Sequence, residues 1–180
     1  MAQFQTVVTD LNVMRGNALV EIAAYVDGEP EWIEVGAVTG LKVEPDAPIA
    51  REENDNADAV ERFNKIEYKI AFNQIEVLKL EAWEILYKGL ADIKMNSSTT
   101  EISVGHLSAI PLIMVRLTTE NDGKTFMGTF FKCNLAKMFG AEYKKDDAED
   151  NRIMIPIELV AKSDSTRANK VFSLEGNFNG

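Results

Sequence analysis

Hydrophobic and polar residues alternate along most of this chain, and the period changes clearly in one place. In the segment 63–93, FNKIEYKIAFNQIEVLKLEAWEILYKGLADI, apolar residues occupy every second position up to Phe72 and every third or fourth position after Asn73. Period two is typical of a strand with one buried face, and the longer spacing is typical of an amphipathic helix. The pattern therefore predicts a strand over 64–73 that runs directly into a helix over 74–88.

The ends of this helix carry recognisable signals. Asn73 is a good N-cap, and Glu76 completes a capping box three residues later. Lys88 stands where the last turn favours a cation, and Gly89 suits the position just past the helix. The face expected to pack on the rest of the protein includes Leu78, Ala82 and Ile85.

Period two dominates elsewhere, and short turn sequences separate the alternating segments. Asp-Gly pairs favour the tight turns that join antiparallel strands. We expect one hairpin from 17–26 and 31–44 around DGEP, and a second from 109–119 and 124–136 around ENDG.

Two more strands are expected near the C-terminus, at 152–164 and 169–177. Pro156 cannot donate a ladder hydrogen bond, which suggests that the first of them lies at a sheet edge.

Two segments are charged and lack the alternating pattern. The longer, 44–62, is an acidic connection whose low hydrophobicity predicts a loop without fixed structure of its own. The shorter, 142–150, is a charged loop between strands. The acidic residues singled out in the long loop are Glu52, Glu53, Asp55 and Asp58.

This order of elements predicts a mainly β protein, an antiparallel β-sandwich or barrel with one flanking helix. The 180 residues are expected to form a single domain with extended ends at 1–16 and 176–180.

The strand 109–117 is apolar on both of its faces. Ile110, Leu112 and Met114 alternate with a second apolar set on the other side. Such a strand either lies between the core and the helix or leaves one face for another subunit to cover. The residues proposed for contact with another subunit are Ile113, Val115 and Leu117.

Composition and charge narrow the possible functions. The chain is 46% hydrophobic and 27% charged, as in ordinary globular proteins, and it lacks the ~18-residue apolar run that a membrane span requires. No secretory signal is recognisable at the N-terminus. With 29 acidic and 19 basic residues the net charge is −10, which disfavours nucleic-acid binding.

No catalytic constellation is recognisable, and we expect neither an enzyme nor a cofactor. His106 is the single histidine and has no nucleophile-elbow sequence beside it. Cys133, the single cysteine, falls in an alternating strand and is expected to be a core residue. The acidic runs ENDNAD and DDAED lack the glycine of a calcium loop, so no metal site is expected.

Three stretches of the chain resemble the major tail tube proteins of long-tailed bacteriophages. They are EVGAVTGLKVEP in the second strand, NQIEVLKLEAWEILYKG in the helix and IPIELVAKSD in the penultimate strand. The resemblance covers roughly residues 17 to 176 and also follows the order of elements.

The resemblance implies a structural virion protein whose copies form hexameric rings. These rings stack into a hollow tail tube, and a sheet from each subunit joins its neighbours to line the lumen. DNA would pass through this lumen without specific binding. The other implied partners are the tape measure, terminator and distal tail proteins, and no membrane is involved. The protein would be made in the bacterial host cytoplasm and reside in the phage tail.

Residue assignments follow from the same resemblance. The strands at 31–44, 64–73, 109–119 and 124–136 would form the lumen-lining sheet, and the 44–62 loop would contact an adjacent ring. The residues expected to face the lumen are Glu34, Glu67, Lys69, Thr118 and Thr129.

Other readings stay open at this point. The chain is also compatible with the inner tube protein of a contractile injection system, which has a related fold. A monomeric carbohydrate-binding β-sandwich is a reading of a different class, and a hydrolase with buried carboxylates is a third.

Overall fold

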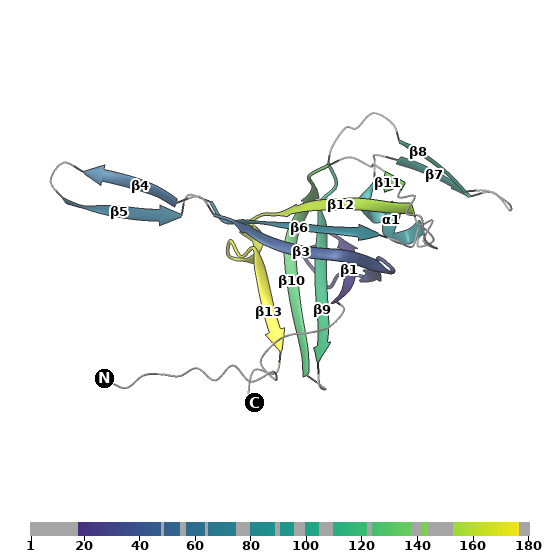
Figure 1. Cartoon of the computed structure of the whole chain (residues 1–180), viewed down its shortest axis with the longest axis horizontal. Helices are drawn as coiled ribbons and strands as arrows, with labels where there is room; N and C mark the ends of the chain where they lie inside the picture. The colour runs from purple at the N-terminus through teal and green to yellow at the C-terminus, as the bar shows by residue number, and fades with distance from the viewer. Residues whose placement is uncertain are drawn as a thin grey trace.

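The computed structural model describes residues 18–47, 49–54, 57–63, 65–74, 80–88, 91–95, 100–104, 110–121, 124–137, 142–143 and 153–176. The fold is mainly β and antiparallel, as predicted, with a nine-stranded sheet in the order β2-β1-β9-β10-β12-β6-β3 (Figure 1). Strands β11 and β13 pair with β12 and β10, and β4-β5 and β7-β8 form separate two-stranded sheets. The elements are β1 Ala18–Ala24, β2 Ile33–Glu34, β3 Val38–Asp46, β4 Ile49–Asn54, β5 Ala57–Phe63, β6 Glu67–Gln74, α1 Leu80–Leu86, β7 Ala91–Met95, β8 Thr100–Val104, β9 Ile113–Asn121, β10 Lys124–Leu135, β11 Glu142–Tyr143, β12 Ile153–Ala161, η2 Ser165–Arg167 and β13 Phe172–Gly176.

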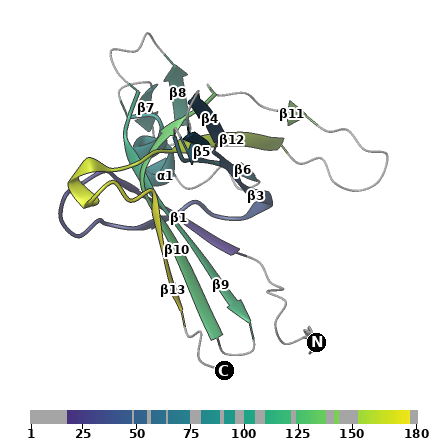
Figure 2. The ribbon, with the colours of Figure 1, turned by 90° about the vertical axis from the view of Figure 1, so that its left-hand side faces the viewer.

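Strand β10 folds the large sheet into two layers. Along one edge its residues 126–130 pair with β13, whereas residues 133–135 pair with β12. The register shifts between Phe130 and Cys133, and such irregularities let a strand bend from one layer into another. We call the strands β2, β1, β9, β13 and the first part of β10 the β1 layer. The end of β10 with β12, β6 and β3 is the β6 layer, which crosses the β1 layer (Figures 1 and 2).

The hydrophobic core fills the space between the layers. Val20, Ile22 and Val115 face it from the β1 layer, and Ile70 and Leu159 face it from the β6 layer. Helix α1 adds the buried side chains of Ala82, Trp83 and Leu86, the following Tyr87 is also buried, and the helix contacts β1 and β2. Each large apolar side chain removed from water contributes about 1.5–3 kcal/mol, so the two layers and the helix stabilise one another.

The strand that precedes the helix ends one residue later than predicted, at Gln74. Asn73 belongs to β6, where it pairs with Thr39 of β3 and Pro156 of β12, so the predicted N-cap at Asn73 is wrong. Pairing on both sides of β6 holds this residue in the sheet. The next residue, Gln74, is buried and donates from Nε2 to the carbonyl of Val35 at 2.8 Å. Leu78 and Gly89 lie outside the described residues, whereas Ala82 and Ile85 pack on the core as predicted.

The first predicted hairpin is wrong beyond β2. Only Ile33 and Glu34 pair with β1, and β3 then pairs with β6 in the other layer. Gly36 and Gly40 have φ values of 97° and 66°, a region that glycine enters without the strain of a side chain. These glycines allow the chain to cross from one layer to the other.

The second hairpin and the last strand are confirmed. Strand β9 pairs with β10 from Asn121 and Lys124 onward, and β13 pairs with β10. Strand β12 lies inside the sheet, so the predicted edge position is wrong for the strand as a whole. The pairing between β12 and β10 nevertheless ends at Leu159. Pro156 therefore has no partner in β10, and its missing N–H breaks no hydrogen bond between these two strands.

The acidic segment 44–62 is a β-hairpin, not a loop. Strand β3 continues to Asp46, and β4 pairs with β5 from Ile49↔Phe63 to Asn54↔Ala57. This hairpin, which we call the arm, extends away from the two layers (Figure 1). Glu, Asp, Asn and Ala are depleted in strands, which is why the sequence pattern did not indicate it. The pairs β7-β8 and β11-β12 are likewise absent from the prediction.

A cluster of polar side chains ties the end of β1 to the connection between β12 and β13. The buried Asp164 carboxylate accepts hydrogen bonds from Tyr25 Oη at 3.1 Å, Thr166 N at 3.0 Å, Thr166 Oγ1 at 2.8 Å and Arg167 Nη1 at 2.6 Å. Arg167 also donates from Nη2 to the carbonyl of Val26 at 2.6 Å. Burial raises the pKa of Asp164, but the hydrogen bonds from Arg167, Thr166 and Tyr25 outweigh it and lower the pKa to about 2.

Replacing this carboxylate should destabilise the fold. We expect Asp164→Asn to lower the free energy of unfolding near neutral pH by about 1–3 kcal/mol, because charged hydrogen bonds to a buried group are lost. The folded pKa of about 2 lies below the unfolded value of about 3.9, so the stabilisation is present above the unfolded value and is lost as the pH falls through the folded one. Thermal melts across this pH range check both points. The exposed Asp27→Asn is the control, and equal pH dependence in wild type and Asp164→Asn would contradict the assignment.

Candidate interaction surfaces

The five residues predicted to face a lumen do not share one surface. Thr118 and Thr129 lie on the outer face of the β1 layer, since Val115, which pairs with Phe130, faces the core. Glu34 is on the same outer face, opposite Glu21. Glu67 and Lys69 alternate with the buried Ile70 and lie on the outer face of the β6 layer. The core separates these faces, so the prediction of a single lumen-facing set is wrong.

The error has a physical origin in the sheet order. The prediction grouped the strands at 31–44, 64–73, 109–119 and 124–136 in one lumen-lining sheet. In the structure β12 lies between β10 and β6, and the fold at β10 turns the two pairs of strands away from each other. Alternation along a strand shows which residues share a face of that strand, but it does not show which strands share a layer.

The outer face of the β1 layer is acidic. Arg116 Nε and Nη2 donate to the two carboxylate oxygens of Glu21, each at 2.6 Å, and its guanidinium lies 4.4 Å from the centre of the Trp32 ring. These two charges offset each other. The strand registers place three further carboxylates on this face, from Glu34, Glu120 and Glu175.

The outer face of the β6 layer carries balanced charges. Four ion pairs join a lysine to a carboxylate there or at its margin, and all four lysines are mostly exposed. Exposed pairs of this kind contribute about 0–1 kcal/mol each, so their partners exchange easily. The pairs are Lys42–Glu44 at 2.5 Å, Lys65–Glu67 at 2.7 Å, Lys69–Asp46 at 3.5 Å and Lys137–Glu158 at 2.7 Å.

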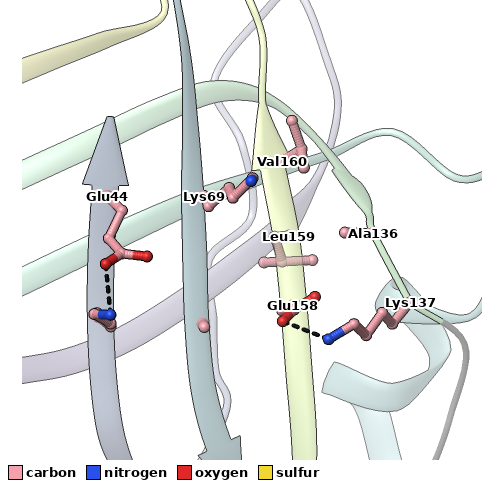
Figure 3. Close-up of a pocket in the computed structure, with 9 residues that line it drawn as sticks. Glu44, Lys69, Ala136, Lys137, Glu158, Leu159 and Val160 are labelled. Atoms are coloured by element: carbon pink, nitrogen blue, oxygen red, sulfur yellow. Dashed lines mark hydrogen bonds and ion pairs between the residues drawn. The ribbon is translucent and has the colours of Figure 1, made fainter. Parts of the chain in front are cut away.

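A groove of about 310 Å³ runs across this balanced face. Its small and apolar lining comes from Ala71, Ala136, Leu159 and Val160 (Figure 3). Charged side chains from β3, β6, β12 and the segment just after β10 surround these residues. They are Lys42, Glu44, Lys69, Lys137 and Glu158.

The apolar strand proposed for contact with another subunit is covered within the chain itself. Ile113 is 1% exposed and Val115 is fully buried, and Leu117 packs against the same core. The inter-subunit prediction for these residues is therefore wrong, because the β6 layer and α1 enclose the core on which they lie. Met114 on the opposite face is also buried, whereas Ile110 and Leu112 before the strand are 52% and 38% exposed.

Apolar side chains remain exposed where the layers diverge. Phe172 and Leu174 of β13 are 38% and 50% exposed. Phe172 lies 5.0 Å from Tyr68 of β6 between ring centres. Ile66 just before β6 is 45% exposed. The sequence pattern groups Ile66 with the buried Ile70 and Phe72, and it did not single out Phe172 and Leu174.

The acidic residues predicted to contact another ring fall on the arm. Glu52 lies on β4 opposite Val60, Glu53 follows it, and Asp58 lies on β5. Asp55 lies outside the described residues. The only partners that the sheet pairings give to β4 and β5, among the described strands, are each other.

The residues considered for catalysis or metal binding form no such site in the described part of the chain. His106 lies outside it. Cys133 is fully buried, and burial raises the pKa of its thiol. No cluster of three or more potential metal ligands occurs among the described residues. No helix among them is long and apolar enough to span a membrane.

Comparisons with known proteins find solved structures that resemble this chain. A chain in the cryo-EM structure of the anti-feeding prophage (AFP) baseplate, 6-fold symmetrised, is 12% identical, with a TM-score of 0.46 over 91% of this chain and 95% of that chain. This score is too low to establish a shared function. No protein-family model matches the chain, and no curated protein matches it.

The buried thiol predicts low reactivity. A reagent that attacks thiolates should modify Cys133 in the native protein about tenfold or more slowly than in the unfolded protein, because burial disfavours the thiolate. Colour release from a disulfide reagent with and without denaturant measures this. Equal rates would show that the core around Cys133 opens readily.

Proposed function

We propose that this protein is a structural subunit of a phage-like tail, in which hexameric rings of the chain stack into a hollow tube. The observation that carries the proposal is the arm, β4-β5, which leaves the body of the subunit. An isolated two-stranded hairpin is at best marginally stable in water. A partner that packs on the arm therefore favours its formation, and a tube provides one in the next subunit or ring.

The edges of the large sheet support the same proposal. Among the described strands, β2 and β3 stand at the two ends of the sheet order. Unpaired edges invite pairing with another chain, and closing strands into a ring removes them. The apolar residues Ile66, Phe172 and Leu174 add surface that association would bury.

We assign the lumen to the outer face of the β1 layer. Glu34, Thr118 and Thr129 lie there with two further carboxylates, whereas lysines balance the acids on the other layer. Duplex DNA carries a negative charge about every 1.7 Å, so an acidic wall offers few contacts that would hold it. Screening limits this repulsion to about 8 Å, and it acts only near the wall.

The remaining parts of the function follow from the resemblance to tail tube proteins. The protein would act in the virion without catalysis, after synthesis in the host cytoplasm. Its partners would be further copies, the tape measure, terminator and distal tail proteins, and DNA in transit. The inner tube of a contractile injection system would place the same surfaces in a related assembly.

Assembly of the purified protein tests the proposal. We expect concentrated protein to form rings or filaments in electron micrographs and to sediment well above the 20.0 kDa monomer. Replacing residues 49–63 with a short Gly-Ser linker should abolish stacking and leave the body folded, because the arm lies outside the core. A wild type that stays monomeric at every concentration would rule out the tube.

Charge reversal tests the lumen assignment. In a phage that carries this chain, Glu34→Lys with Glu175→Lys should slow DNA ejection, since both changes add phosphate-binding charges to the proposed wall. The control is Glu67→Lys, a single charge reversal on the other layer. DNA release from purified particles measures the rate. If the control slowed release and the double variant did not, the lumen would lie on the β6 layer.

A further inference from the structure

The groove on the β6 layer has the features of a receptor surface. Its apolar lining includes Ala71 and Ala136, whose small side chains let a backbone approach closely, and charged side chains surround these residues (Figure 3). Lys42, Lys69 and Lys137 are 65%, 59% and 71% exposed, so their ammonium groups are available to a partner.

The groove differs in charge from the rest of the protein. Three lysines and two glutamates line it, and Asp46 beside it pairs with Lys69, so the charges around the groove balance on a chain whose net charge is −10. Copies of an acidic protein repel one another, and the repulsion is least where the local charge is positive or balanced. The groove is therefore a favourable place for an acidic part of a second copy.

The arm supplies such a part. Its described strands contain four carboxylates against two arginines. Glu52 and Glu53 are consecutive in β4, where the register with β5 shifts between Glu52 and Asn54. Strands rise about 3.3 Å per residue, which gives the arm a length of about 20 Å for reaching another molecule.

We propose that the arm of one copy docks in the Lys42–Lys69–Lys137 groove of another copy. The inference rests on the proposed function and deepens it, because it names the surface that receives the arm. The arm does not fold back onto its own groove: β3 ends at Asp46, the arm begins at Ile49, and it extends away from the sheet (Figure 1). Docking therefore joins different copies.

Docking would let lysines of the groove change their ion-pair partners from carboxylates of their own chain to carboxylates of the arm. Lys42 and Lys137 pair with Glu44 and Glu158 in the single chain. Each exposed pair is weak, so a lysine exchanges its partner at little cost. Burying several pairs together beneath the arm strengthens them, since the local dielectric falls and salt screens them less.

Paired charge reversals test this docking. The groove variant is Lys42→Glu with Lys69→Glu, and the arm variant is Glu52→Lys with Glu53→Lys. We expect each to require about tenfold or more protein to assemble, as loss of about 1.4 kcal/mol implies. The variant that combines all four changes should recover most of the assembly, because its groove and arm are again opposite in charge. Sedimentation velocity across a concentration series measures the shift.

Mixing gives a sharper readout. In a mixture, the native arm of the groove variant meets the native groove of the arm variant, and the reversed arm meets the reversed groove, so both contacts join opposite charges. The mixture should therefore assemble at a lower protein concentration than either variant alone, with the two variants in alternation. Lys124→Glu with Lys170→Glu, an equal change of charge at exposed lysines outside the groove, should assemble like the wild type. Thermal melting of every variant verifies folding.

The outcomes separate the two proposals. If the wild type assembles and the groove variant matches it, the arm binds elsewhere and this docking is wrong, although the tube proposal stands. A combined variant that assembles no better than either double variant also overturns the docking. If the wild type forms no assembly, the tube proposal itself fails.

Discussion

The fold depends on one strand that belongs to both layers. Strand β10 pairs with β13 along its first part and with β12 at its end, with an irregular register between Phe130 and Cys133. Phe130 and Cys133 are buried on either side of this irregularity, so the core itself fixes where the sheet folds. If the bend moved by one residue, side chains of β10 would exchange between core and solvent. The positions of the groove, the acidic face and the exposed apolar residues all follow from this bend.

The sequence predicted local structure well and long-range arrangement less well. Period-two alternation identified β1, β6, β9, β10, β12 and β13, and it placed Ala82 and Ile85 on the buried face of the helix. It did not reveal that β3 pairs with β6, because the partner of a strand depends on distant residues. The N-cap signal at Asn73 was overridden by pairing on both sides of β6. The arm lacks typical strand residues, and its pairing could not be read from composition.

For the candidate surfaces too, the sequence indicated which residues are exposed along a strand but not which strands share a layer. The sequence selected Glu34, Thr118 and Thr129 as exposed polar positions of one sheet, and they share the outer face of the β1 layer. It also selected Glu67 and Lys69, which lie beyond the core on the other layer. Ile113 and Val115 are apolar because the core requires them, although their pattern equally suited an interface. The groove combines residues from three strands and from the segment that follows β10, and no single stretch of sequence contains enough of them to indicate it.

Strand β3 leads directly into the arm, so the arm and the groove have fixed positions on the same subunit. Lys42 and Glu44, beside the groove, lie on the strand that leads into the arm within a few residues. If the arm docks as proposed, each copy carries a donor and an acceptor that point different ways, and a row of such copies is polar. One end of that row would expose an arm without a groove, and the other a groove without an arm. Proteins that cap the two ends would accordingly need different shapes, and growth at the two ends would proceed at different rates.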